Sequence, residues 1–134
     1  MADGRTAAAA FILGASAVQL GTAFLLCEEA EVRAAYRAAL AAADDASTVV
    51  TDLISGRPCR YIHNRLIDDL VGSGLEPPPV PAQYSLTRPL DAGGDREWTV
   101  LTSGQSAALA RATTAAELVE RLADETTRRL RAFA

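Results

Sequence analysis

The feature that most constrains this fold is a short apolar run, residues 17–26, that lies between two segments with helical periodicity. The run reads AVQLGTAFLL and follows a turn residue, Gly14. An apolar run of this length bounded by a turn is typical of a buried strand, and helix, strand and helix in short alternation indicate an α/β protein. Gly21 and Thr22 interrupt the run at its centre. Because glycine weakens the interior of a strand, this interruption calls for an explanation.

Gly21 and Thr22 expose consecutive main-chain N–H groups, and residue 21 has no side chain to block them. If a turn or a short helix begins there, these donors and the helix dipole form an anion site suited to phosphate. Barrel enzymes of the (β/α)8 type commonly bind phosphate at the loops after strands 7 and 8. The local pattern also leaves a second interpretation open, in which Gly21 only relieves crowding within a strand.

The rest of the chain alternates between predicted helices and extended segments. A capping box of Thr114 and Glu117 begins the last helix. The segment GSGLEPPPVP, residues 72–81, is too rich in proline and glycine for a helix or a central strand, and Gly93 and Gly94 mark a further loop. Predicted helices cover residues 4–13 (capped by Asp3), 28–43, 60–71, 105–112 and the segment after Thr114, and residues 48–54 form a strand or an extended segment.

Composition excludes several classes of function. The chain has 134 residues, the size of one ordinary domain, and 49% of them are hydrophobic, which argues against disorder. Alanine is the largest part of that share, so large core side chains are few. A net charge of −4 argues against a general nucleic-acid binder. All 13 basic residues are arginine, which excludes a Schiff-base lysine or a P-loop lysine.

The sequence gives no indication of a membrane partner or of a secreted protein. No apolar run reaches the roughly 18 residues that span a bilayer. The residues before the first apolar stretch carry no net positive charge, which argues against a signal peptide. Cys27 and Cys59 form no CxxC pair, so reduced thiols are expected, with Cys27 acting as a small buried hydrophobe. We therefore expect a cytoplasmic protein.

Motifs along almost the whole chain resemble those of the nitronate monooxygenases, FMN enzymes formerly called 2-nitropropane dioxygenases. The matching segments keep the order and the approximate spacing of the family pattern, with Leu20 in place of the methionine of the family. They are ADGRTAAAAFILGASAVQLGTAFL (2–25), CEEAEVRAAYRAAL (27–40), SGRPCRYIHNR (55–65), SGQSAALAR (103–111) and AAELVERL (115–122).

The resemblance implies an α/β fold that is the C-terminal portion of an FMN-dependent (β/α)8 TIM barrel. The chain would supply about helix 7, strand 8 and the C-terminal helices, and would be mostly helical as a fragment. Residues 1–71 would form the barrel segment with the FMN-phosphate loop, and residues 72–134 a connector and a helical extension of the same domain. The implied cofactor-binding residues are Gln19, Leu20, Gly21 and Thr22, with the phosphate held by the amides of Gly21 and Thr22.

The implied activity is the oxidation of alkyl nitronates with molecular oxygen. The family's catalytic histidine belongs to an N-terminal portion that this chain does not contain, so no catalytic residue is expected here and the isolated chain is expected to be inactive. Two alternatives remain. One is the related FMN-dependent enoyl-acyl-carrier-protein reductase. The other is a non-catalytic half-barrel that completes a separately encoded N-terminal partner, associates with itself, or is a remnant.

A few polar residues have both a functional and a structural interpretation. Arg57 and Gln105 are candidates for the mouth of the active site, and Arg57 and Arg60 could meet an anion near the flavin. In the structural interpretation, the two arginines are solvated or form surface ion pairs, and Gln105 makes a hydrogen bond at the start of a helix. Cys59 and His63 have the spacing of two metal ligands on one helix face, but no further ligands lie nearby, so no metal is expected.

Overall fold

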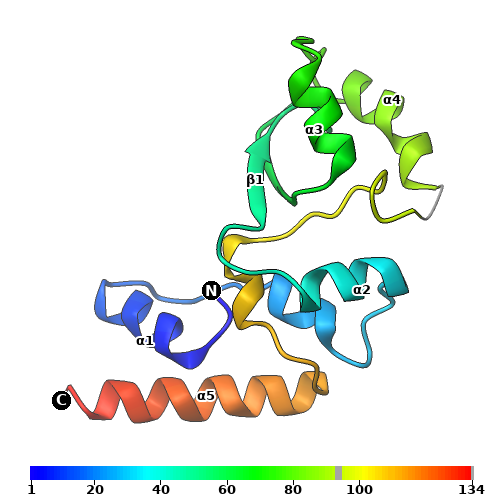
Figure 1. The fold of residues 1–134 in the computed structure, drawn as a ribbon. Coiled ribbons are helices and arrows are strands. Elements are labelled where there is room, and N and C mark those ends of the chain that lie inside the picture. The colour runs from blue at the N-terminus through cyan, green and yellow to red at the C-terminus, as the bar shows by residue number, and fades with distance from the viewer. Residues whose placement is uncertain (93–94, 134) are drawn as a thin grey trace.

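The computed structural model describes residues 1–92 and 95–133. Helices α1, α2 and α5 lie in the lower part of the view in Figure 1, and β1, α3 and α4 lie in the upper part. Most of the regular secondary structure in the described residues is helical, and there is one two-stranded sheet. In chain order the elements are α1 (Gly4–Ile12), the 3-10 helix η1 (Thr22–Leu26), α2 (Ala34–Ala41), β1 (Thr48–Thr51), β2 (Cys59–Ile62), α3 (Arg65–Gly72), α4 (Ala82–Asp91), the 3-10 helix η2 (Gln105–Leu109) and α5 (Ala115–Arg131).

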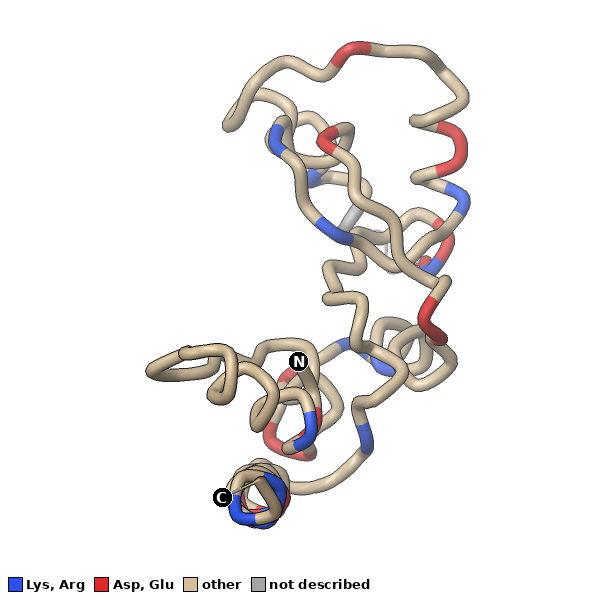
Figure 2. Tube along the Cα trace, turned by 90° about the vertical axis from the view of Figure 1, so that its left-hand side faces the viewer, with Lys and Arg blue, Asp and Glu red and all other residues tan. Residues whose placement is uncertain are grey.

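Charged residues of both signs are distributed over the two parts of the molecule (Figure 2). In α5, which is seen end-on in that view, the first turn holds Glu117 and the last turn holds Arg128, Arg129 and Arg131. This order of charges complements the helix dipole. Of the helices described, none is at once long and apolar enough to cross a lipid bilayer.

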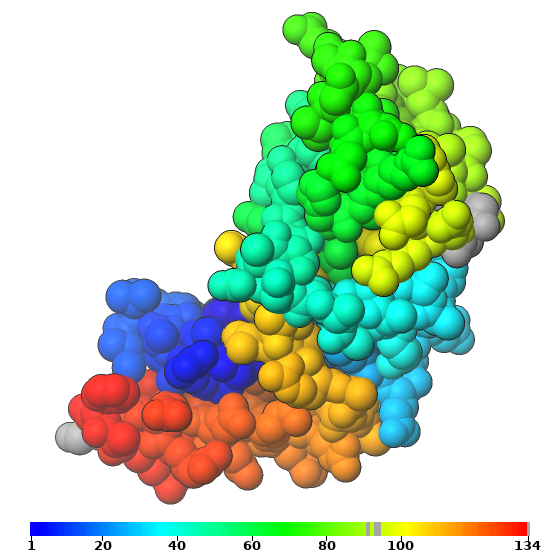
Figure 3. All heavy atoms as spheres, in the orientation of Figure 1, coloured from blue at the N-terminus to red at the C-terminus, as the bar shows by residue number. Residues whose placement is uncertain are grey.

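Helix α1 packs against α5 at the base of the molecule (Figure 3). The two helices approach closely at Gly4, where a β-carbon would lie 2.3 Å from Cβ of Glu125 and 2.7 Å from the main-chain N of Thr126. Glu125 also accepts a hydrogen bond from the Gly4 amide, with 3.0 Å between Gly4 N and Glu125 Oε2. The absence of a side chain at position 4 is therefore what allows this contact.

The ends of α1 and α5 are formed as the sequence predicts. Asp3 caps α1, because its Oδ1 accepts a hydrogen bond from the amide of Thr6 at 2.8 Å. After the helix, Gly14 adopts a φ of +98°, which glycine tolerates better than other residues. Thr114 and Glu117 form the predicted capping box at the start of α5. These predictions succeed because caps depend on local hydrogen bonds.

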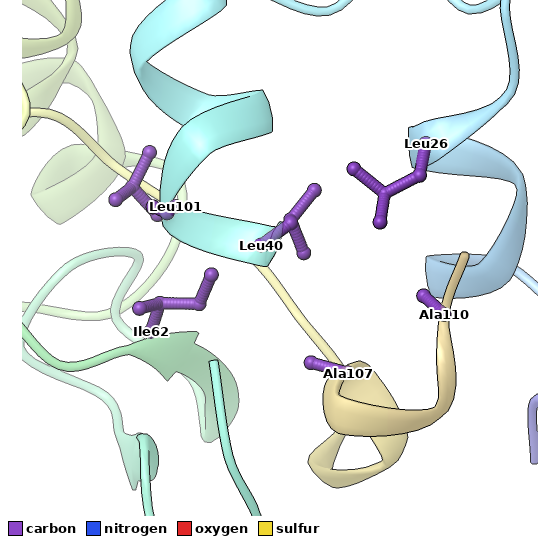
Figure 4. Close-up of a cluster of buried hydrophobic side chains, with 7 residues drawn as sticks. Leu26, Leu40, Ile62, Leu101, Ala107 and Ala110 are labelled. Atoms are coloured by element: carbon purple, nitrogen blue, oxygen red, sulfur yellow. The ribbon is translucent and has the colours of Figure 1, made fainter. Parts of the chain in front are cut away.

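A buried hydrophobic cluster connects the lower part of the molecule to the upper part. In Figure 4, Leu40 of α2 lies close to Leu26 of η1 and to Ile62 of β2. Each such side chain contributes about 1.5–3 kcal/mol when fully buried. Smaller side chains complete this cluster, in keeping with the alanine-rich composition. Its buried members are Leu26, Ala39, Leu40, Ile62, Leu101, Ala107 and Ala110; two further clusters contain Ala2, Ala23, Cys27 and Leu118, and Ile54, Tyr61, Leu66 and Ile67.

Asn64 organises the upper part. Strands β1 and β2 form an antiparallel pair, and Asn64 then caps α3 by accepting a hydrogen bond from Ile67 N at 3.3 Å. The amide nitrogen of the same side chain donates to the main-chain oxygens of Arg96 and Thr99, at 3.0 and 2.8 Å. Asn64 is buried, so one side chain both starts a helix and holds the returning chain against it.

The buried strand predicted over residues 17–26 is wrong. Residues 17–20 have no regular secondary structure and are exposed or half-buried, and η1 follows them. A strand requires main-chain hydrogen bonds to a neighbouring strand, and no described residue pairs with 17–20 in a ladder. Ala23 and Leu26 are buried from within η1, so part of the apolar pattern reflects the packing of a short helix.

The helix predicted over residues 28–43 begins only at Ala34. The segment before it serves a distant helix instead. Both carboxylate oxygens of Glu29 accept a hydrogen bond from the amide of Ala115, at 3.0 and 2.9 Å, and so add to the capping of α5. Glu29, which the sequence places before the next helix along the chain, therefore stabilises the start of α5 instead.

Other elements also differ from the prediction. The first residues of the predicted helix 60–71 belong to β2, because they pair with β1. Helix α4 was not predicted; it is attached by Thr87, whose hydroxyl donates to the main-chain oxygen of Ile54 at 2.7 Å. Gly93 and Gly94, predicted as a loop, lie outside the described residues. Two predicted segments are shorter than expected: 48–54 becomes Thr48–Thr51 and 105–112 becomes Gln105–Leu109.

We expect Gly4→Ala to lower the free energy of unfolding by about 1–3 kcal/mol, because the added methyl group collides with Glu125 and with the main chain of Thr126. Urea unfolding followed by circular dichroism measures this change. Gly72→Ala is the matched control, since no described heavy atom lies within 4 Å of its β-carbon position and alanine favours helix. Equal midpoints for Gly4→Ala and the unmodified chain would contradict the α1–α5 contact.

We expect the cap at Asp3 to weaken at low pH. Burial alone raises the pKa of the Asp3 carboxyl, but the hydrogen bonds from Thr6 and the charge of Arg5 outweigh it, so its pKa lies below the ordinary value of 3.8. A lowered pKa contributes stability above pH 3.8 that is lost as the pH falls through the folded-state value. Asp3→Asn keeps the cap without the charge. Thermal melts from pH 6 to pH 2 should therefore show a smaller loss of stability for Asp3→Asn, and parallel losses would contradict this expectation.

Candidate functional site

Gly21 and Thr22 lie at the start of η1, and the space around the β-carbon position of Gly21 is open. Gly21 is the residue before η1 and is exposed, and no described heavy atom lies within 4 Å of its β-carbon position. Its carbonyl accepts a hydrogen bond from Phe24 N at 2.9 Å. Within residues 1–92 and 95–133, no acceptor is found for the main-chain N–H groups of Gly21, Thr22 and Ala23. Such donors are free to bind an anion.

A hydrogen bond joins Thr22 to the segment that begins η2. The main-chain N of Gly104 donates to Oγ1 of Thr22 over 2.9 Å, across 82 positions in sequence. The contact is tight, because a β-carbon at position 104 would lie 3.3 Å from Thr22 Oγ1. The structure therefore brings together two of the segments that the sequence singled out, residues 19–22 and the start of η2 at Gln105. The side chain of Gln105 is exposed.

Gln19 and Leu20 precede this corner and border an apolar groove. Gln19 is exposed and Leu20 is half-buried. The groove has a volume of about 620 Å³ and runs between α1, η1 and α5. Phe11 and Leu122 line it from the two long helices. Of the four residues implied for cofactor binding, Gly21 and Thr22 thus have amides without an acceptor among the described residues, whereas Gln19 and Leu20 lie beside an apolar surface.

Arg57 lies in the loop between β1 and β2. Its side chain is exposed, and its main-chain oxygen accepts a hydrogen bond from Ser55 Oγ at 3.0 Å. Gly56, at φ +80°, packs closely on the proline-rich connector, since its β-carbon position lies 2.6 Å from the main-chain oxygen of Pro78. Among the described residues, no hydrogen bond or ion pair joins Arg57 to residues 19–22 or to Gln105.

Arg60, Cys59 and His63 make structural contacts. Arg60 Nη1 donates to Thr48 Oγ1 at 3.0 Å within the hairpin. Cys59 belongs to β2, so Cys59 and His63 do not lie on one helix face. His63 is exposed, with Nε2 3.1 Å from Oδ1 of Asp68. The described part of the chain contains no group of three or more His, Cys, Asp and Glu side chains able to hold a metal ion.

Cys27 is the small buried hydrophobe that the sequence predicts. It is 2% exposed, and its thiol lies 3.9 Å from the main-chain oxygen of Ala23. Burial raises the pKa of the thiol, and the charge of Glu29 adds to this effect. A raised pKa keeps the sulfur protonated and unreactive at neutral pH. Cys27 is thus a buried packing residue at the C-terminal end of η1.

One residue near the site could not have been found from the sequence. Arg37, in α2, donates hydrogen bonds to three main-chain oxygens at the end of η1 and just beyond it. The sequence offers only an arginine within a helical pattern, with no motif around it. Gly104 is different, because the SGQ motif already marks its position.

Comparison with known proteins identifies the family. A family model described as nitronate monooxygenase matches residues 1–125. The chain belongs to the nitronate monooxygenase family. A nitronate monooxygenase of Pseudomonas aeruginosa is 44% identical over 128 residues, which cover 92% of this chain and 36% of the relative. A probable nitronate monooxygenase of Staphylococcus haemolyticus is 37% identical over 127 residues, again 92% of this chain and 36% of the relative. The chain thus spans about 36% of the length of these curated relatives.

Solved structures share the fold of this family member over its whole length. Nitroalkane oxidase from Streptomyces ansochromogenes superposes with a TM-score of 0.90 at 33% identity, covering 100% of this chain and 39% of its own. FabK from Thermotoga maritima superposes with a TM-score of 0.81 at 30% identity, covering 100% of this chain and 45% of its own. The same backbone arrangement therefore occurs inside considerably longer chains.

We expect Thr22→Val to lower the free energy of unfolding by about 1–3 kcal/mol, because it removes the acceptor of the Gly104 amide and leaves that donor unpaired. Thr22→Ser keeps the hydroxyl and is the matched control. Amide hydrogen exchange at Gly104 should accelerate in Thr22→Val and stay close to the unmodified rate in Thr22→Ser. Unchanged exchange in both variants would show that the hydrogen bond contributes nothing.

Proposed function

We propose that the chain supplies the FMN-phosphate site of a (β/α)8 barrel enzyme that oxidises alkyl nitronates with molecular oxygen. The observation that carries this proposal is the corner at Gly21 and Thr22. Its amides have no acceptor among the described residues, and the space over Gly21 is open. Family membership and the likeness to nitroalkane oxidase support the reaction class.

The residues present fit the phosphate end of FMN. Main-chain N–H groups suit a phosphate, because they supply short donors without the bulk of side chains. Gly21 and Thr22 hold the phosphate, and Gln19 and Leu20 carry the chain up to it. Gln105 follows Gly104 in the chain, and we place it at the mouth of the active site. Arg57 is the other residue that we propose for the mouth. FMN, when bound, supplies the redox chemistry, while the protein binds and orients it.

In this proposal the chain contributes no catalytic residue. His63 is exposed and paired with Asp68, and it contacts none of the residues at the Gly21 corner in the described structure. The catalytic base then comes from an N-terminal half-barrel. The curated relatives are long enough to contain one, because this chain matches only about 36% of the relative's length. Residues 1–71 and 72–134 act as parts of one domain, supported by the α1–α5 packing and the Thr22–Gly104 hydrogen bond. The proposed setting is the cytoplasm, with a nitronate and oxygen as small-molecule partners.

A second candidate is the FMN-dependent enoyl-acyl-carrier-protein reductase activity. The Gly-Thr step at residues 21–22 and the SGQ motif at residues 103–105 resemble elements of this reductase. The SGRP segment, residues 55–58, favours the monooxygenase. Both activities use the same proposed phosphate corner.

We expect Gly21→Asp to weaken FMN binding by at least about tenfold, because a carboxylate placed over the free amides repels the phosphate. Gly21→Asn is the matched control, since it has nearly the same size without the charge and position 21 has room for it. Quenching of FMN fluorescence measures both affinities. Equal FMN affinity in Gly21→Asp and Gly21→Asn, or no FMN binding by the unmodified chain, would contradict the proposed cradle.

A further inference from the structure

Arg37 contacts the end of η1 that is opposite to the Gly21 corner. Its Nη1 lies 2.9 Å from the main-chain oxygen of Leu26. Its Nη2 lies 3.1 Å from the oxygen of Cys27 and 3.0 Å from that of Ala30. A guanidinium holds its donors in a rigid planar fork, so three carbonyls bound at once fix both the side chain and the main chain around it.

These contacts add hydrogen bonds at the C-terminal end of η1. The last carbonyls of a helix have no partner within the helix itself. The Phe24 carbonyl accepts from Cys27 N at 3.1 Å, and Arg37 supplies donors to the carbonyls of Leu26 and Cys27. A cation at this end also complements the negative pole of the helix.

The other end of η1 is held by Thr22, whose hydroxyl accepts from Gly104 N at 2.9 Å. Because η1 has only five residues, a displacement of one end is transmitted to the other. Arg37 reaches η1 from α2, and α2 in turn packs through Leu40 into the cluster shared with β2. Arg37 therefore contacts the far end of the short helix that begins at the Gly21 and Thr22 amides.

We propose that Arg37 is a positioning residue for the anion-binding corner at Gly21 and Thr22. It never touches the phosphate; it fixes η1, and η1 fixes the amides. This inference rests on the proposed function, since it assigns the corner to the phosphate of FMN. Arg37→Lys keeps the charge but offers a single ammonium group that cannot reach three carbonyls in the same planar geometry.

The test compares FMN with riboflavin, which lacks the phosphate. We expect Arg37→Lys to weaken FMN binding about tenfold, the effect of losing one amide hydrogen bond to the phosphate when η1 shifts, and to change riboflavin binding less than about twofold. Arg65→Lys is the matched control, because Arg65 lies in α3 and stacks over Trp98, 5.4 Å from its ring centroid. A merely structural role of Arg37 would weaken both ligands equally.

Amide hydrogen exchange at Phe24 and Cys27 gives a second readout that needs no ligand. Faster exchange in Arg37→Lys, and not in Arg65→Lys, supports the control of η1 by Arg37. Unchanged exchange, or an FMN preference that survives in Arg37→Lys, overturns the inference. If the unmodified chain binds FMN no better than riboflavin, the phosphate site itself is wrong and the proposed function fails, whatever the exchange rates show.

Discussion

The hydrogen bond between the Gly104 amide and the Thr22 hydroxyl joins two segments that lie 82 positions apart. It sets the start of η1, where the candidate site lies, beside the start of η2. The contact leaves little room at position 104, since a β-carbon there would lie 3.3 Å from the hydroxyl. Arg37 at the other end of η1 completes the arrangement. A short helix can hold amides in place only when its ends are anchored, because so few hydrogen bonds lie within it.

Small residues make the close packing possible, and they also limit how much surface the chain buries. The accessible surface is 8129 Å², whereas a compact protein of 14.1 kDa exposes about 6,700 Å². Part of the difference is apolar: Leu13 is 88% exposed and Phe133 is 77% exposed. An exposed apolar surface beside the groove between α1, η1 and α5 is in keeping with the proposal that this chain is one portion of a larger barrel.

Local signals predicted several elements well. Asp3, Gly14 and the Thr114–Glu117 box mark helix ends through hydrogen bonds between near neighbours, so their geometry follows from a few adjacent residues. The strand over 17–26 failed because a strand is defined by a partner that the local pattern cannot supply. The start of the helix predicted over 28–43 was wrong for a similar reason. The Glu29 carboxylate caps α5, far along the chain, and α2 begins only at Ala34. The predicted helix over 60–71 also starts late, because residues 60–62 pair with β1 as part of β2.

The sequence by itself determined the helix caps, the turn glycines, the small core side chains and, through its ordered motifs, the family. Each of these depends on residue type and on spacing along the chain. Only the tertiary structure decided that Thr22 meets Gly104, that Arg37 holds the end of η1, and that Arg57 lies in a loop packed on the connector instead. Such contacts join segments distant in sequence, and their distances follow from how whole elements pack, which no local pattern encodes.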